Sequence, residues 1–441
     1  MRRLLFTSAV LVSARVMSAD AQGTADSVVR RQQRTIDSIS AALRAVKERV
    51  DSLSAAPAAA PAAAGAPARA AGAYMNIGFD GLVDAGWSTN PVLTFLQGGD
   101  HDPLVRGFTI PNAELTLDGA VDPYFKGFAN IVYKLDRTAE TAVELEEVYA
   151  ITTSLPNNFQ AKIGQFLAEF GRQNQQHPHA WSFVDAPLVM NQMFGRDGLR
   201  SQGLRMSWLA PTPWYTEVMV AVLNSAGGTA FSFRSDDSPN IHGGVIVPRE
   251  VAGLGDMLYV PRIATSADLT DNTTLVAGVS GAFGPNNSGP TARTQIYGAD
   301  LYWKWKSPRA AAGFPFVSFQ TEGMYRNYGA ALRARLDDPQ RLFLEETLHD
   351  GGVYAQVLWG IRPRIVAGFR YDWISADSVS FEPELRPERF RLSPNFTWYP
   401  TEFSKIRFQY NFDRRGQEFG NDSSVWVQFE FILGAHAAHK F

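Results

Sequence analysis

From about residue 74 to the end of the chain, apolar and polar residues alternate in segments of eight residues or more. In the segment KIRFQYNF, residues 405–412, Ile406, Phe408, Tyr410 and Phe412 alternate with arginine, glutamine and asparagine. A period of two residues is that of a β-strand whose two faces meet different surroundings. The pattern therefore predicts an all-β fold for this part of the chain, and the links between the segments decide which one.

The links are sorted by length. Those after even-numbered segments are tight turns such as VDP, PNN and APTP, whereas those after odd-numbered segments are longer, the longest spanning 89–104, 168–197, 226–256 and 329–351. Short and long links that alternate over an even number of antiparallel strands are the topology of a bacterial outer-membrane barrel. We therefore predict that residues 74–441 form a transmembrane antiparallel β-barrel of about 16 strands. The predicted strands are 75–88, 105–118, 122–135, 143–155, 158–167, 198–210, 212–225, 257–267, 271–284, 293–306, 314–328, 352–361, 363–377, 387–399, 402–414 and 423–433.

Two further segments stand at the N-terminus. Residues 1–21, MRRLLFTSAVLVSARVMSADA, combine arginines, an apolar run and a small-residue cleavage site, as a signal peptide does. Residues 22–54 carry a heptad pattern of apolar residues, which predicts a short α-helical coiled coil in the periplasm. The β-branched Ile39 and Val46 at d positions favour three strands or more, and a helix that folds back on its own chain is the alternative.

The segment 55–73, rich in alanine and proline, cannot build a core and is expected to be a linker between the coiled coil and the barrel.

The composition excludes several functional classes. A net charge of -3 argues against nucleic-acid binding, and the absence of cysteine removes disulfides, thiolate metal sites and cysteine nucleophiles. None of the seven histidines lies in a recognisable nucleophile motif, and the sequence G-x-S-x-G does not occur. We therefore expect neither an enzyme nor a cofactor.

The third long link, 168–197, has the sequence AEFGRQNQQHPHAWSFVDAPLVMNQMFGRD. The signal peptide, coiled coil, Ala/Pro arm and strand number resemble those of the outer-membrane porins of the phosphate-selective porin O and P group. Residues 145–172, LEEVYAITTSLPNNFQAKIGQFLAEFGR, are similar to the strand-turn-strand that precedes the third loop in that group. The resemblance implies that this third loop folds into the lumen and narrows the channel. Phosphate channels of that group use dense rows of arginine and lysine, whereas this loop has no lysine and two arginines. The sequence therefore indicates a porin more firmly than a phosphate channel.

A loop inside a water-filled pore needs apolar anchors and polar groups that face the pore. The anchors would be Phe170, Trp181, Phe183, Leu188, Val189, Met193 and Phe194. The groups expected to set the constriction and its selectivity are Arg172, His177, His179, Asp185 and Arg196.

Within this set, Asp185 is expected to anchor the loop by pairing with Arg172 or Arg196. His177 and His179 are expected to form hydrogen bonds rather than a metal site, and to titrate near pH 6.5 if they face the pore. The alternative is a metal ion held by these two histidines, with Asp185 as the local third ligand.

The polar row of the strands should line the pore. Its cations are Lys162, Arg205, Lys304, Arg364, Arg370, Arg391 and Arg407, and its acids are Asp118, Asp300, Asp372 and Glu430. This slight cationic excess favours small anions.

The sequence thus predicts a homotrimeric porin in outer-membrane lipid that passes small hydrophilic and anionic solutes by diffusion. Two alternatives stay open. One is an occluded barrel with a binding or envelope-tethering role, and the other is metal-linked uptake through His177 and His179.

Overall fold

The computed structural model describes residues 75–136, 138–235, 244–311, 313–335, 338–375, 388–416 and 420–434. The predicted signal peptide, coiled coil and linker lie outside the described residues. Within those ranges, no helix is long and apolar enough to cross a membrane.

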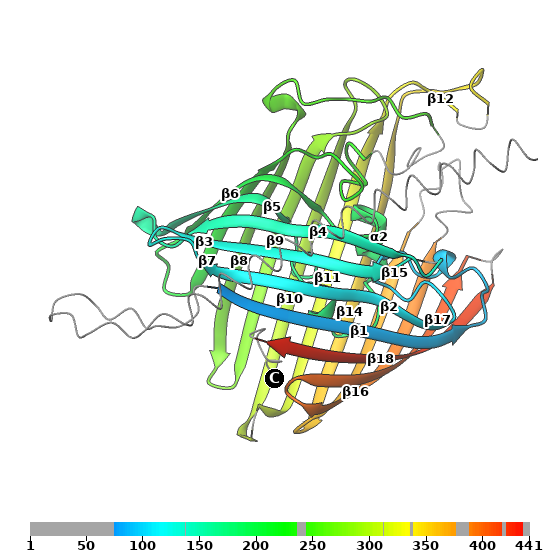
Figure 1. Ribbon diagram of the computed structural model, residues 1–441. Helices are drawn as coiled ribbons and strands as arrows, with labels where there is room; N and C mark the ends of the chain where they lie inside the picture. Colours follow the sequence, from blue (N-terminus) through cyan, green and yellow to red (C-terminus); the bar gives the residue numbers. More distant parts are fainter. Residues whose placement is uncertain are drawn as a thin grey trace, which may run out of the picture. The chain divides into compact units, whose positions relative to one another are not determined.

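Sixteen antiparallel strands follow one another in sequence order and close into a barrel (Figure 1). The first strand, β1 (Met75–Ser88), pairs on one side with β2 (Gly107–Ala120). On its other side it pairs with the last strand, β18 (Asn421–Gly434), and this pairing closes the barrel. The other strands are β3 (Phe125–Leu135), β4 (Thr141–Thr152), β5 (Phe159–Leu167), β6 (Arg200–Leu209), β7 (Tyr215–Leu223), β8 (Leu258–Thr270), β9 (Thr273–Pro285), β10 (Arg293–Ala311), β11 (Phe314–Ala330), β14 (Glu346–Arg362), β15 (Ile365–Ile374), β16 (Arg389–Thr401) and β17 (Ser404–Arg415).

The fold prediction is confirmed, because each of the sixteen predicted strands has its counterpart in the barrel. The largest difference lies at β14, which begins at Glu346 rather than at residue 352. In the link before it, β12 (Arg333–Ala334) and β13 (Leu342–Phe343) form a separate two-stranded sheet that the alternation pattern did not indicate.

The two faces of the strands follow the alternation. On β17 and β18, apolar side chains of the outer row are between 39% and 49% exposed: Phe408, Tyr410, Val425, Val427 and Phe429. The alternating polar side chains are at most 4% exposed: Lys405, Arg407, Gln409, Gln428 and Glu430. The apolar row therefore faces outward and the polar row lines the interior, as a barrel in lipid requires.

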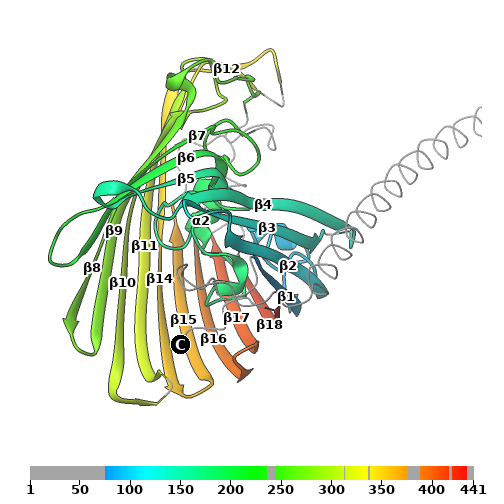
Figure 2. The same cartoon turned by 60° about the vertical axis from the view of Figure 1, so that its left-hand side comes forward.

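The link between β5 and β6, residues 168–199, crosses the interior of the barrel. It reaches β4 through His177, β9 through Gly171, β15 through Leu188 and β17 through Val184, which are strands on different sides of the ring. The link contains η3 (Pro178–Ala180) and the short helix α2 (Leu188–Phe194), and Figure 2 shows α2 within the ring of strands. The expected inward fold of this loop is thus present in the structure, and we call residues 168–199 the inner loop.

Apolar packing fixes one side of the inner loop. The expected anchors Phe170, Val189, Met193 and Phe194 are buried in one cluster with side chains of the barrel wall. Of the seven anchors only Trp181 is partly exposed. The turn at Gly171 has φ +60, and a Cβ there would lie 2.0 Å from a carboxylate oxygen of Glu322, so the loop needs glycine at this point.

The shorter links carry the remaining helical turns. η1 (Leu93–Phe95) follows β1, η2 (Pro156–Asn158) forms the turn between β4 and β5, and η4 (Leu254–Asp256) precedes β8.

The closing seam between β1 and β18 supplies a test of the fold. A Cβ added at Gly86 would lie 2.3 Å from the carbonyl oxygen of Val425 and 2.2 Å from the ring of Trp426. We expect Gly86→Leu to force the strands apart and to lower the free energy of unfolding by about 1–3 kcal/mol. The measurement is the temperature at which the fast-migrating folded band in detergent gels converts to the unfolded band.

Gly253→Leu is the control, because a Cβ at Gly253 meets nothing within 4 Å. A Gly86→Leu protein that converts at the wild-type temperature would contradict the closed seam.

Candidate functional site

Asp185 of the inner loop is held between two arginines of the barrel wall. Its Oδ1 accepts a hydrogen bond from Arg370 of β15 at 2.6 Å, and its Oδ2 accepts one from Arg391 of β16 at 2.7 Å. Gln97, Gln409 and Asn411 donate further hydrogen bonds to the same carboxylate. Burial alone would raise the pKa of Asp185, but Arg391, Arg370 and these donors hold it well below its usual value. Asp185 is therefore a charged anchor for the loop.

The expected partners of Asp185 were wrong. Arg172 instead lies over the ring of Tyr302, 4.1 Å from its centre, and donates a hydrogen bond to Gln320 at 3.2 Å. Arg196 pairs with Asp100 at 3.3 Å, and its side chain is 56% exposed. Sequence proximity suggested the local arginines, whereas the crossing of the barrel brings Asp185 to β15 and β16.

The two histidines are turned towards acids of the wall. The Nε2 of His177 lies 2.8 Å from Glu147, its Nδ1 lies 2.8 Å from Glu146, and the Nδ1 of His179 lies 2.9 Å from Glu114. A β-bulge explains why both adjacent glutamates are inside: the register with β3 shifts at Asn130, so that Glu146 is the extra residue of β4. The sequence showed the pair of glutamates but not this bulge.

This placement also corrects the expected titration near pH 6.5. Burial by itself would lower the pKa of His177, but Glu146 and Glu114 outweigh it and raise the pKa well above the usual value. Burial likewise opposes protonation of His179, and Glu114 is the main cause of the net upward shift of its pKa. The acids thus favour a positive charge at both rings.

The inner loop therefore meets two sectors of the wall with opposite charges. The acidic sector consists of Asp80, Asp84, Glu114, Glu146, Glu147 and Glu430, on β18, β1, β2 and β4. The arginine sector consists of Arg370, Arg389, Arg391 and Arg407, on β15, β16 and β17. The histidines of the loop face the first sector, and its buried carboxylate faces the second.

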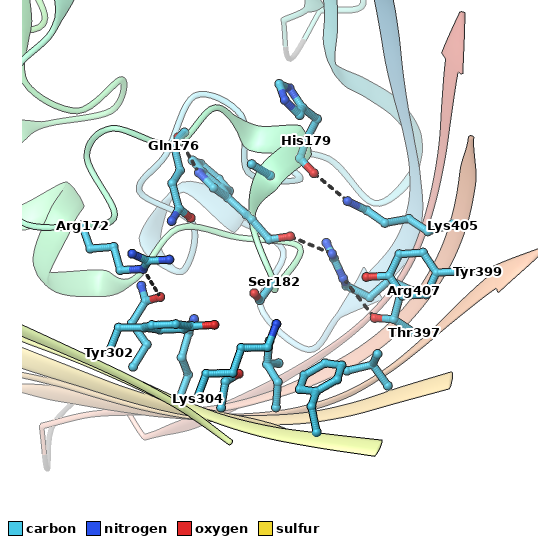
Figure 3. A pocket seen from close by; sticks show the side chains of 18 of the residues that line it. Arg172, Gln176, His179, Ser182, Tyr302, Lys304, Thr397, Tyr399, Lys405 and Arg407 are labelled. Atoms are coloured by element: carbon cyan, nitrogen blue, oxygen red, sulfur yellow. Dashed lines mark hydrogen bonds between the residues drawn. The ribbon is translucent and has the colours of Figure 1, made fainter. Parts of the chain in front are cut away.

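A cavity of about 380 Å³ lies between the inner loop and the wall (Figure 3). The side chains of Arg172, Lys304, Lys405 and Arg407 come into it from different sides, and no carboxylate is among the described residues that line it. Lys405 pairs with Glu430 at 2.5 Å outside this lining. We call this cavity the basic chamber.

Two further cavities lie next to it and share lining residues. A cavity of about 40 Å³, the neck, shares Gln176 and Trp181 with the basic chamber. The neck shares Asn191, Arg196 and Asp197 with a third cavity of about 970 Å³, which we call the mixed chamber because both acids and arginines line it.

The other predicted wall residues also have defined places. Lys162 and Arg205 both contact Glu169 of the inner loop, at 2.5 Å and 3.3 Å. Arg364 was wrongly assigned to the lumen, because it is exposed in the tight turn between β14 and β15, where its φ is +72.

The charge anchor can be tested by removing the charge of Asp185. We expect Asp185→Asn to destabilise the docked inner loop by about 3–5 kcal/mol, because two buried guanidiniums lose their shared carboxylate. Amide hydrogens of residues 168–199 should then exchange faster with deuterium, while those of the strands should stay protected.

The matched control is Asp256→Asn, which removes one carboxylate from the pair with Arg249 in another link. Unchanged protection of the inner loop in Asp185→Asn would show that apolar packing alone holds it.

Comparison with known proteins places this geometry among outer-membrane barrels. The outer membrane channel DcaP of Acinetobacter baumannii superposes with a TM-score of 0.52 at 13% identity, over 81% of this chain and 97% of that one. OprB of Pseudomonas putida superposes with a TM-score of 0.50 at 10% identity, over 81% and 94%. These identities show a shared fold. No family model matches the sequence.

One relative is similar in sequence as well. An uncharacterized protein of Aquifex aeolicus is 33% identical over 380 residues, which cover 80% of this chain and 74% of the relative. The chain therefore belongs to the same protein family as this Aquifex aeolicus protein.

Proposed function

We propose that the protein is an outer-membrane porin that lets small hydrophilic solutes diffuse through its lumen and favours anions. The observation that carries the proposal is the basic chamber, where four cationic side chains enter one cavity without a carboxylate among the described lining residues. The outward apolar row supports a place in lipid, and the fold shared with the channel DcaP supports a pore.

The charges of the chamber differ in how far they are neutralised. Lys405 is paired with Glu430, so its field is partly cancelled. Arg172, Lys304 and Arg407, by contrast, have no carboxylate oxygen within 4.0 Å in the part of the chain that the structure describes. The guanidinium of Arg407 donates instead to Gln428 and to carbonyl oxygens of the inner loop. A low-dielectric wall focuses the field of such charges across a narrow aqueous section. Arg172, Lys304 and Arg407 should therefore contribute most to anion preference.

The neck sets the size of what can pass. One water molecule needs roughly 10–15 Å³ of such space, so a neck of about 40 Å³ has room for only a few. A cavity of this volume can hold a small ion, and a larger solute would need the inner loop to move. The resemblance to phosphate-selective porins is a hypothesis, since the chamber cations come from β10, from β17 and from one position of the inner loop rather than from a row on the loop.

The narrow neck also favours the second candidate function, an occluded barrel with a binding or envelope-tethering role. Recording from single channels in a planar lipid bilayer separates the two, because an occluded barrel gives no conductance steps.

The selectivity prediction concerns Arg172 and Lys304, because Arg407 also holds the inner loop through the carbonyl oxygens of Trp181 and Phe183. In a potassium chloride gradient we expect the wild-type reversal potential to indicate chloride preference. Arg172→Gln with Lys304→Gln should reduce the chloride-to-potassium permeability ratio severalfold. The effect should be larger at 0.1 M salt, where charges are screened over about 10 Å, than at 1 M, where the length is about 3 Å.

Arg196→Gln is the matched control, because it removes a cation of the same loop that is paired with Asp100 and lies outside the basic chamber. Equal reversal potentials in the double variant and the wild type would refute the role of the chamber.

We also propose that three copies associate through the heptad segment, with residues 22–54 in the periplasm. Native mass measurement of the mature protein in detergent should give a trimer, and deletion of residues 22–73 should reduce its share. A monomer at all concentrations would contradict this assembly.

A further inference from the structure

We propose that the inner loop and the acidic sector form a binding site for a divalent transition-metal ion such as Zn²⁺. Its ligands would be Glu114, Asn130, Glu146 and His177. The inference does not depend on what the basic chamber conducts, because it rests on a separate cluster of side chains and is tested by binding.

The spacing of three ligand atoms fits a metal ion. One carboxylate oxygen each of Glu114 and Glu146 and the Nδ1 of His177 all lie within 4.8 Å of one another. The Nδ1 of His177 is 2.8 Å from Glu146 and 3.8 Å from Glu114. A tetrahedral zinc ion with bonds of about 2.0–2.1 Å holds its ligand atoms about 3.3 Å from one another. This separation lies between the 2.8 Å and 3.8 Å found for the Nδ1 of His177.

Asn130 supplies the fourth position. One terminal atom of its side-chain amide lies 3.1 Å from Glu114, 3.1 Å from Glu146 and 3.0 Å from His177. With the amide nitrogen there, the buried Oδ1 has no hydrogen-bond partner. A half-turn of the amide exchanges the two atoms and directs the oxygen at the same three groups, where a cation would bind it. Asn130, which is 1% exposed, can therefore offer its oxygen to a cation held between Glu114, Glu146 and His177.

The surrounding contacts are those of a metal centre. The carboxylate of Glu147 lies 2.8 Å from the Nε2 of His177 and would hold the proton on that nitrogen, which leaves the lone pair of Nδ1 for the ion. Glu114 is oriented by Asn112, which donates to its other oxygen at 2.6 Å, and by His179 at 2.9 Å. Such outer contacts fix ligand geometry in known metal sites.

Charge and access agree with this assignment. Three carboxylates surround one imidazole, so a cation bound among them would offset part of their negative charge. Glu146 also lines the neck, which gives an ion an approach from the lumen.

A second group of acids, Asp100, Glu144 and Asp197, differs because the ammonium of Lys134 already contacts all three, at 2.8–3.8 Å. The cluster at His177 has an imidazole and no lysine contact among the described residues, and the nearest guanidinium is that of Arg200, 3.9 Å from Glu146.

The test measures metal binding to the full-length protein in detergent after removal of metals with a chelator. Calorimetry with Zn²⁺ gives stoichiometry and affinity, and the visible absorption of Co²⁺ reports tetrahedral coordination. We expect one ion per chain, at least about tenfold weaker binding in His177→Gln, and tighter binding in Asn130→Asp, where either terminal atom is a charged oxygen. His349→Gln, which removes a histidine on β14, is the control and should bind as the wild type does.

Heat-modifiable gel mobility shows whether each variant is folded. If His177→Gln does not fold, the affinity of Asn130→Asp compared with that of the wild type tests the proposal. Equal affinity in the wild type, His177→Gln and Asn130→Asp would place the ion elsewhere and overturn the proposal. Failure of the wild-type protein to bind either metal would overturn it too.

Discussion

The shared ion pair of Asp185 with Arg370 and Arg391 is the interaction on which the interior of this barrel depends. All three side chains are at most 1% exposed, and a buried charge is tolerated only when it is paired and hydrogen-bonded. Asp413 pairs with Arg391 and Asp372 with Arg370, so the network is neutralised on several sides. The carboxylate comes from the inner loop and the two guanidiniums come from the barrel wall. Moving the loop away from the wall would therefore leave buried charges without their partners.

This pairing also decides which cations remain to act on a solute. The arginines that bind Asp185 have their charge cancelled and serve the structure. Arg172 and Lys304 contact aromatic rings instead, and these leave the positive charge in place. A count of cations on the pore wall therefore overstates what a passing ion meets, and the few cations without a carboxylate partner matter most.

At the other edge of the inner loop the charges are exchanged, because there the wall carries the acids and the loop carries the basic side chains. Glu114, Glu146 and Glu147 face His177 and His179, so a positive charge is required between loop and wall. Protons on the two rings or a bound divalent ion can supply it. In both cases the loop is held at two edges, by an acid in the arginine sector and by histidines in the acidic sector.

The inward course of residues 168–197 was implied by the resemblance to known porins, whereas the sequence by itself determined the barrel, its sixteen strands and the inward and outward rows of the regular strands. These features are encoded locally, since a period of two residues, turn sequences and link lengths can be read without knowing any distant contact. Only the tertiary structure decided that Asp185 meets Arg370 and Arg391, that a bulge turns Glu146 inward, and that four cations share one chamber. The two contacts of Asp185 join residues 185 and 206 positions apart. All of these features depend on strand register, where a shift of one residue would turn each side chain to the opposite face.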